Sequence, residues 1–221
     1  FTDNVFTENR SRILEICNRL RAERFGLFYS CDIRAGTVDA ELLHEMELAG
    51  FRHVAIGFED ADLAVLSRVN KKTEPTRNIE TARLIRSETQ MAITAYWMVG
   101  LPGTTMDSLS TNLVTVKRLI EEDIVDVVSP RIFVPYPGTT IFRAPRRFGV
   151  EILDRDWAHY DRVTSLPTCR LEHVEREQLY RSYLALRTTI NEAYRKKLGI
   201  DADRLLDAVR RSRAMGEWAY S

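Results

Sequence analysis

The 221-residue sequence is poor in cysteine, has no surplus of charge of either sign and contains no long apolar run. Its three cysteines, Cys17, Cys31 and Cys169, are widely spaced, which predicts neither a disulfide framework nor a metal site within this chain. A reducing cytoplasm fits this cysteine usage best. Lys plus Arg and Asp plus Glu number 32 each, which argues against nucleic acid as the main partner, because phosphate binding usually needs a basic surplus. No run reaches the roughly 18 apolar residues of a membrane span, so no membrane contact is expected.

Several familiar motifs are missing too. The sequence has no GxxxxGKS/T phosphate loop, no GxGxxG dinucleotide turn, no GxSxG nucleophile elbow and no HExxH zinc helix, and its four histidines are scattered. What remains is the composition of an ordinary globular domain, with 44% hydrophobic and 29% charged residues. The sequence opens at Phe1 rather than at methionine, inside what reads as a strand, and we therefore expect further sequence to precede it.

Short apolar strands alternate with amphipathic helices over the first two thirds of the chain. The pattern predicts strands at residues 1–2, 27–33, 53–58, 91–99 and 124–134, the last interrupted by Pro130, and helices at residues 9–24, 39–48, 62–70, 78–87 and 107–121. Such alternation predicts right-handed parallel βαβ units, and so an α/β fold that is part of a barrel or an open wound sheet. In either case the loops after the strands gather at one end, where ligands bind.

The alternation stops after residue 140. Residues 142–168 carry no regular pattern, whereas residues 174–198 have apolar side chains at helical spacing and end at Gly199. A shorter basic helix is expected at residues 202–213. We therefore predict two parts, a partial barrel over residues 1–142 and a mainly helical extension over residues 143–221.

Polar and glycine residues follow the predicted strands, and each has two interpretations. Glu59 either accepts hydrogen bonds from a ligand or stabilises the next helix through its dipole. Arg34 either pairs with a ligand carboxylate or forms an internal ion pair with Asp32 or Asp3. The turn Gly100-Leu101-Pro102-Gly103 either lets the backbone approach a ligand or is a tight, capped strand-to-helix turn. Tyr96 and Tyr136 either line a pocket or belong to the core.

The order of these features resembles the radical S-adenosylmethionine (SAM) superfamily, particularly its cobalamin-binding branch. The matching segments are FTDNVFT at 1–7, SCDIR at 30–34, AGF at 49–51 with IGFE at 56–59, NKK at 70–72, GLPGT at 100–104 and PYPGT at 135–139. Asn4, Asp60 and Thr104 depart from the family pattern. The resemblance implies strands two to six of a TIM-like horseshoe, without the first strand and the CxxxCxxC loop that binds a 4Fe–4S cluster.

The resemblance also implies roles for matched residues. Asp3 and Asn4 would approach the SAM amino group, and Ser30 and Glu59 would contact its polar atoms. Lys71 and Arg34 would neutralise the SAM carboxylate. Gly100, Leu101, Pro102 and Gly103 would let the backbone approach the adenosyl end, and Tyr96 and Tyr136 are the candidate catalytic side chains on the substrate side. No metal ligand is assigned within this chain.

Three functions remain open from the sequence. The first is a cobalamin-dependent radical SAM methyltransferase for a small molecule, for example in natural-product biosynthesis, with SAM, a 4Fe–4S cluster, cobalamin and an electron donor such as flavodoxin or ferredoxin. The second is a cobalamin-independent radical SAM enzyme, such as a cyclase, oxidative decarboxylase or methylthiotransferase. The third is a non-catalytic interaction domain derived from the barrel. As an enzyme fragment, the chain alone is expected to be inactive.

Overall fold

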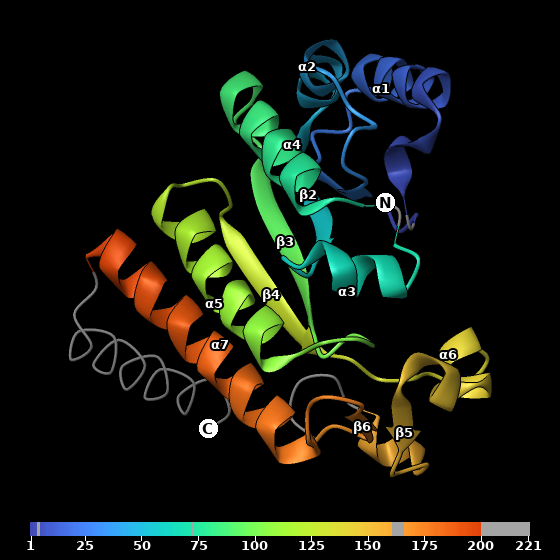
Figure 1. The fold of residues 1–221 in the computed structure, drawn as a ribbon. Helices are drawn as coiled ribbons and strands as arrows, with labels where there is room; N and C mark the ends of the chain where they lie inside the picture. The colour runs from blue at the N-terminus through green and yellow to red at the C-terminus, as the bar shows by residue number, and fades with distance from the viewer. Residues whose placement is uncertain (4, 72, 161–165, 200–221) are drawn as a thin grey trace, which may run out of the picture.

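A computed structural model describes residues 1–3, 5–71, 73–160 and 166–199, and a four-stranded parallel sheet forms its centre (Figure 1). The strands lie in sequence order: β1 Tyr29–Ile33, β2 Phe51–Glu59, β3 Ala92–Val99 and β4 Val127–Ile132. All adjacent pairs are parallel, so the carboxyl ends of the four strands meet at one edge. The α/β fold expected from the alternation is therefore confirmed.

Helices cover one face of the sheet (Figure 1). They are α1 Arg10–Glu23, α2 Ala40–Leu48, α3 Leu63–Arg68, α4 Pro75–Glu88, α5 Met106–Glu121 and α7 Arg176–Leu198. Strand residues such as Ile93, Ala95 and Trp97 are buried in one core cluster with residues from these helices. Local sequence explains several boundaries: Pro75 occupies the first turn of α4, Thr105 and Ser108 form a capping box on α5, and Gly199 ends α7 with a φ of 60°.

The opposite face of the sheet, which we call the inner face, carries the alternate side chains of each strand. Successive strand residues point to opposite faces, and this set is mostly polar whereas the helix-covered set is mostly apolar. The inner face consists of Ser30, Asp32, His53, Ala55, Gly57, Glu59, Thr94, Tyr96, Met98, Val127, Ser129 and Arg131. In a barrel-type sheet this is the side that faces the lumen.

Several predicted boundaries were wrong. Residues 1–2 form no strand, so four parallel strands stand where five were expected; the Phe1 ring instead packs on Phe6 and Phe51. The last strand begins at Val127 and continues through Pro130. The amides of Ile124 and Val125 bond instead to the Leu119 carbonyl oxygen of α5. An edge strand tolerates proline because no neighbour needs one side of its backbone.

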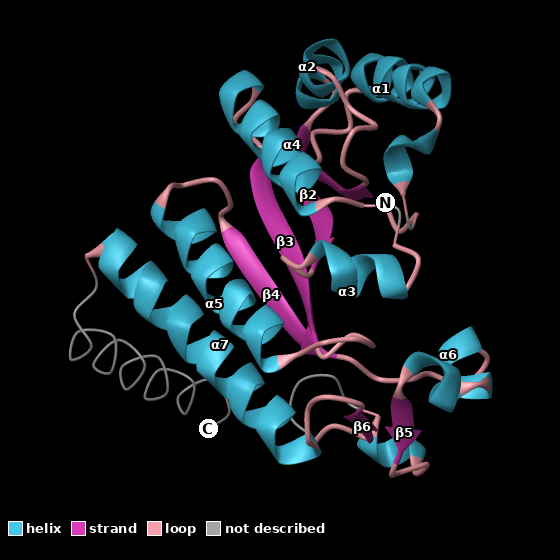
Figure 2. Ribbon diagram, viewed as in Figure 1, coloured by secondary structure: helices cyan, strands magenta, loops and turns pink. Residues whose placement is uncertain are grey.

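The segment expected to be irregular, residues 142–168, contains the strand β5 Val150–Ile152, which pairs antiparallel with β6 Cys169–Leu171 just beyond it (Figure 2). Three short helical turns lie near them in sequence, α6 Thr140–Arg143, η2 Pro145–Phe148 and η3 Trp157–His159. A fourth, η1 Phe6–Glu8, lies near the start of the chain. Val150 and Leu171 are buried opposite each other, and Glu151 pairs with Arg170. Three-residue strands are too short to show an alternating pattern, which is why the sequence did not reveal them. The helix predicted at residues 202–213 lies outside the described residues.

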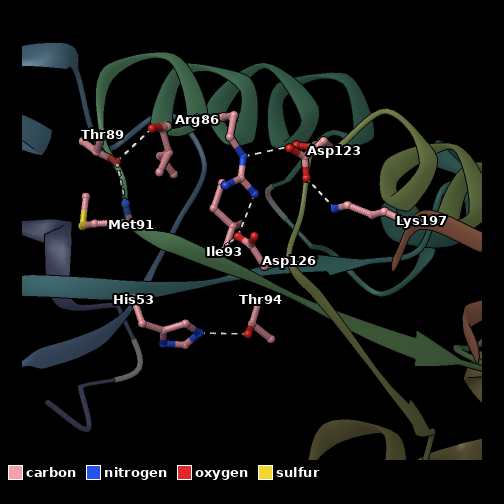
Figure 3. Close-up of polar contacts among 10 residues, drawn as sticks. His53, Arg86, Thr89, Met91, Ile93, Thr94, Asp123, Asp126 and Lys197 are labelled. Atoms are coloured by element: carbon pink, nitrogen blue, oxygen red, sulfur yellow. Dashed lines mark hydrogen bonds and ion pairs between the residues drawn. The ribbon is translucent and has the colours of Figure 1, made fainter. Parts of the chain in front are cut away.

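The amino end of the sheet is held by a polar network (Figure 3). The Asp126 carboxylate accepts hydrogen bonds from Arg86 Nη2 and from the Ile93 amide, both at 2.7 Å. Arg86 Nε also donates to the Asp123 carbonyl oxygen at 3.1 Å, and the Asp123 carboxylate pairs with Lys197. These bonds join α4, β3, β4 and α7, so this end of the sheet has a structural role. No described helix is long and apolar enough to cross a membrane.

Candidate functional site

The carboxyl end of β2 has a strained backbone at Glu59. Its φ is 66°, in the left-handed region that residues with a Cβ rarely adopt, and the register with β3 shifts between Gly57 and Glu59. The Asp60 amide donates to the Phe58 carbonyl oxygen at 2.8 Å, which closes a three-residue turn centred on Glu59. Strain of this kind persists only where the surroundings impose it, and it concentrates at functional sites.

The turn brings two of the predicted site residues together. Lys71 Nζ lies 2.9 Å from Glu59 Oε1, and the Glu59 side chain is only 16% exposed. A Cβ at Gly57 would lie 3.0 Å from Glu59 Oε1, so glycine leaves room for the carboxylate to fold over the inner face. Lys71 follows the end of α3 rather than lying within a helix, and its amide bonds to the Leu66 carbonyl oxygen at 3.0 Å. The result is an ion pair at the edge where ligands bind in parallel sheets.

Asp60 lies directly after this turn and is 1% exposed. Its carboxylate accepts hydrogen bonds from the Asp62 amide at 2.8 Å and from Asn112 Nδ2 at 3.1 Å. Asn112 Oδ1 in turn accepts a bond from the Ala61 amide at 2.7 Å. Burial raises the pKa of Asp60 to about 6, although these hydrogen bonds act in the opposite direction. The hydrogen bonds between Asn112 and residues 60–61 attach the loop after β2 to α5, directly after the Glu59 turn.

The turn after β3 requires glycine at two positions, because of its backbone conformation and its close packing. Gly100 and Gly103 have φ values of 88° and 93°, and a Cβ at Gly100 would lie 2.7 Å from the Leu179 side chain on α7. A Cβ at Gly103 would lie 2.7 Å from Arg68 Cδ. Leu101 and Pro102 between them are buried. The interpretation of this segment as a tight packed turn therefore has direct support, whereas its contact with SAM remains a prediction.

The remaining predicted residues are dispersed. Asp3 pairs with Arg12 at 3.1 Å, and Asn4 lies outside the described residues. Arg34 does form an internal ion pair, but with Glu8 at 2.8 Å rather than with Asp32 or Asp3. Ser30 lies within β1, not in the loop after it.

Strand register separates Ser30 from the Glu59 turn. Ser30 pairs with His53 near the start of β2, whereas Glu59 is the last residue of that strand. Ser30 and Glu59 therefore lie toward opposite ends of the inner face, about 20 Å apart along the strands.

The two tyrosines occupy different places. Tyr96 is 40% exposed at the middle of the inner face. Tyr136 follows β4, where its hydroxyl donates to the Tyr160 carbonyl oxygen at 3.2 Å and its ring lies 6.1 Å from that of Tyr160. Of the two, Tyr96 is the one that faces the lumen side of the sheet.

Sequence reasoning missed a hydrogen-bonded row across the inner face. His53 Nδ1 lies 2.6 Å from Ser30 Oγ, and His53 Nε2 lies 2.8 Å from Thr94 Oγ1 (Figure 3 shows the second contact). The available signal was alternation: His53 and Thr94 are spaced from Glu59 and Tyr96 by even numbers of residues, which places them on one face.

The described residues contain no group of three His, Cys, Asp or Glu side chains arranged to hold a metal ion. All three cysteines are free and buried, on α1, β1 and β6. Burial raises the pKa of Cys17 to about 11 and those of Cys31 and Cys169 to about 12. Since the thiolate is the form that binds iron or zinc, these side chains do not suit a 4Fe–4S cluster.

A protein from Pyrococcus horikoshii, described as the uncharacterized methyltransferase PH0819, is 24% identical to the chain over 179 residues. The match covers 81% of this chain and 37% of that protein. No family model matches the sequence. The chain thus spans little more than a third of this relative.

Solved structures of radical SAM enzymes share the fold. Coproporphyrinogen III oxidase HemN from Escherichia coli has a TM-score of 0.53 and 17% identity, covering 82% of this chain and 37% of its own. The methyltransferase TsrM from Kitasatospora setae, solved with cobalamin and a 4Fe–4S cluster, has a TM-score of 0.51 and 18% identity, covering 72% and 32%. Methylornithine synthase PylB has a TM-score of 0.51 and 16% identity, covering 84% and 45%. The chain has the fold of part of a radical SAM barrel, as the resemblance implied.

Proposed function

We propose that this chain is part of the catalytic barrel of a cobalamin-dependent radical SAM methyltransferase that acts on a small molecule. The observation that carries the proposal is the Glu59–Lys71 pair at the carboxyl edge of a parallel sheet whose fold is shared with radical SAM enzymes. The order of the family's strand segments along the chain supports the same assignment.

The residues at this edge fit the polar part of SAM. Glu59 offers a carboxylate to a ligand ammonium group, and Lys71 offers an ammonium to a ligand carboxylate. In the structure the two side chains satisfy each other, so a ligand that carries both charges would replace one ion pair with two. When bound, SAM supplies a reactive alkyl group, and the protein supplies orientation and exclusion of water.

The chain's own cysteines do not fit the iron–sulfur cluster, because they are buried and widely spaced. We therefore assign the cluster, and any cobalamin, to residues outside these 221. This assignment accords with the chain's coverage of only 32–45% of the solved radical SAM enzymes named above.

Methyl transfer is supported by two of the similar proteins. PH0819 is described as a methyltransferase, and TsrM is a radical SAM methyltransferase that was solved with cobalamin. HemN and PylB match the fold with similar TM-scores and are not described as methyltransferases, which motivates a second candidate, a radical SAM enzyme that catalyses another reaction without cobalamin. The two candidates differ in one measurable respect, dependence on cobalamin.

The test uses the full-length protein, reconstituted anaerobically with iron and sulfide. We expect Fe–S charge-transfer absorbance, SAM binding, and SAM consumption that requires cobalamin. Consumption that is equal without cobalamin would favour the second candidate, and absence of a cluster or of SAM binding would contradict both.

The variant Glu59→Gln tests the assigned site. It should lower SAM affinity about tenfold, because a charge-assisted hydrogen bond is lost, while iron content stays unchanged. Glu88→Gln, an exposed substitution at the far end of α4, is the matched control and should bind SAM as the wild type does. Equal SAM affinity in both variants would remove Glu59 from the site.

A further inference from the structure

Two charged residues of the inner face, Asp32 on β1 and Arg131 on β4, have no ion-pair partner among the described residues. Both are partly buried. Other partly buried charges near them are paired, as Glu59 is with Lys71 and Arg86 with Asp126. Partial burial weakens the hydration of a charge, so an unpaired charge in such a place gains more from a ligand of opposite charge than a fully exposed one does.

The geometry of its neighbours explains why Asp32 stays unpaired. Two groups that can carry positive charge act on Asp32, the Phe1 ammonium and His53. The Phe1 ammonium donates to the Ser30 carbonyl oxygen at 2.8 Å, and the two ring nitrogens of His53 are occupied by the Ser30 and Thr94 hydroxyls. His53 therefore has no N–H left to donate to Asp32. Burial raises the pKa of Asp32, and His53 and the Phe1 ammonium oppose that rise through their charges without forming an ion pair with it. A cation from outside the chain is the partner that this carboxylate lacks.

Arg131 also has few protein partners for its guanidinium group. Its Nη1 donates to the Pro130 carbonyl oxygen at 3.0 Å, which leaves most of the five guanidinium N–H groups without a protein acceptor. Arg131 also borders a hollow of about 240 Å³ at the open edge of β4, lined by Ser129 and by Tyr183 and Arg187 of α7. The guanidinium is thus accessible to a carboxylate or phosphate from solution.

Tyr96 lies between these two charges. Its register partner on β4 is Ser129, two residues before Arg131, and its partner on β2 is Gly57. Burial raises the pKa of Tyr96, with Asp32 adding to the rise and Arg131 opposing it, so both charges act on its hydroxyl. Ala55 and Gly57 have little or no side chain, so no large side chain of β2 separates Asp32 from the exposed Tyr96 ring.

The two charges are too far apart to pair with each other. β1 and β4 are three strand spacings apart, about 14 Å. Asp32 is in register with Ala55, Thr94 and Val127 in turn, and Arg131 lies four residues beyond Val127, about 13 Å further along. A ligand that meets both must carry its charges several bonds apart.

We infer that the inner face binds an elongated zwitterion, with its cationic group at Asp32, its anionic group at Arg131 and its body across Tyr96. His53 is a positioning residue, because its hydrogen bonds to Ser30 and Thr94 join β1, β2 and β3 next to Asp32. The assignment of this zwitterion as the enzyme's substrate rests on the function proposed above, but its binding does not. It names a substrate class, and its site adjoins the proposed SAM site without using Glu59 or Lys71.

The test measures binding to the 221-residue chain without any cofactor, by chemical shift changes in NMR titrations. The probe is 6-aminohexanoate, which carries an ammonium and a carboxylate at opposite ends of a flexible chain; hexylamine and hexanoate carry one charge each. We expect 6-aminohexanoate to bind about tenfold more tightly than either, with shifts at Asp32, Tyr96 and Arg131.

Variants give a crossed pattern. Asp32→Asn should weaken 6-aminohexanoate and hexylamine about tenfold and leave hexanoate unchanged, whereas Arg131→Gln should weaken 6-aminohexanoate and hexanoate and leave hexylamine unchanged. Asp107→Asn and Arg147→Gln are exposed controls, and the spectra of all variants report whether they fold.

The inference is overturned if 6-aminohexanoate does not bind, if the chemical shift changes lie away from the inner face, or if the two charge variants weaken the same singly charged probe. If one charge variant fails to fold, the preference of the wild-type chain for 6-aminohexanoate over its singly charged analogues still decides. Because no cofactor is present, failure here leaves the SAM experiment standing, and failure of SAM binding leaves this result standing.

Discussion

At the scale of single residues, the end of β2 contains a strained backbone and a buried acid, and nearby hydrogen bonds stabilise both. Glu59 has a positive φ, and Asp60 is an acid with almost no exposure to solvent. The bonds from Asn112 and from the Asp62 amide hold this turn in place. The strain places the Glu59 carboxylate over Gly57, where it meets Lys71.

Asp60 predicts an unusual pH dependence of stability. Its pKa is raised from 3.8 to about 6 in the folded protein, so between these values the folded state binds more protons than the unfolded state. The free energy of unfolding should therefore fall as the pH rises from about 4 to about 6, by an amount on the order of 3 kcal/mol from this group. Urea unfolding across this pH range measures the slope.

Asp60→Asn, which cannot titrate, isolates this effect. Its stability should lack the decline that Asp60 contributes, whatever its absolute stability, whereas the exposed substitution Asp107→Asn should keep the slope of the wild type. Parallel slopes in Asp60→Asn and the wild type would show that Asp60 titrates normally.

At the scale of elements, the turn after β3 depends on how closely α7 approaches it. Gly100 has both a positive φ and a side chain from α7 where a Cβ would lie, whereas Gly138 has a similar φ of 87° with nothing within 4 Å. The two glycines therefore separate backbone strain from steric overlap.

Gly100→Ala should lower the free energy of unfolding by about 2–4 kcal/mol, since it adds overpacking against Leu179 to the backbone term. Gly138→Ala should cost about 1–2 kcal/mol from the backbone term alone. Chemical denaturation of both variants measures the difference. Equal losses would mean that α7 does not constrain this turn.

At the scale of the whole molecule, the core crosses the boundary predicted at residue 142. One cluster of buried residues joins the sheet and α5 to the segments beyond that boundary, including Val150, Leu171 and Leu179. Ion pairs follow the same path: Arg68 of α3 bonds to Glu172 at 2.8 Å, and Lys196 of α7 bonds to Glu121 at 2.9 Å.

This continuity predicts a single cooperative unfolding transition. Leu186→Ala on α7, where the side chain is 2% exposed, should lower the free energy of unfolding by about 2–5 kcal/mol and shift the whole transition. Leu184→Ala on the same helix, at 42% exposure, is the control and should change stability by about 0.5 kcal/mol or less. Circular dichroism and tryptophan fluorescence should report the same midpoint. Two separate transitions would support residues 143–221 as an independent unit.

The sequence by itself determined the parallel α/β order, most helix boundaries and the gathering of Glu59 and Gly100 at one edge, because periodicity and turn residues act over short stretches of chain. Only the tertiary structure decided that Lys71 pairs with Glu59, that Arg34 pairs with Glu8 and that Gly100 is packed against α7. It alone placed Ser30, His53 and Thr94 in one hydrogen-bonded row. These relations join residues far apart in sequence, and they depend on strand register and helix packing, which no local pattern specifies.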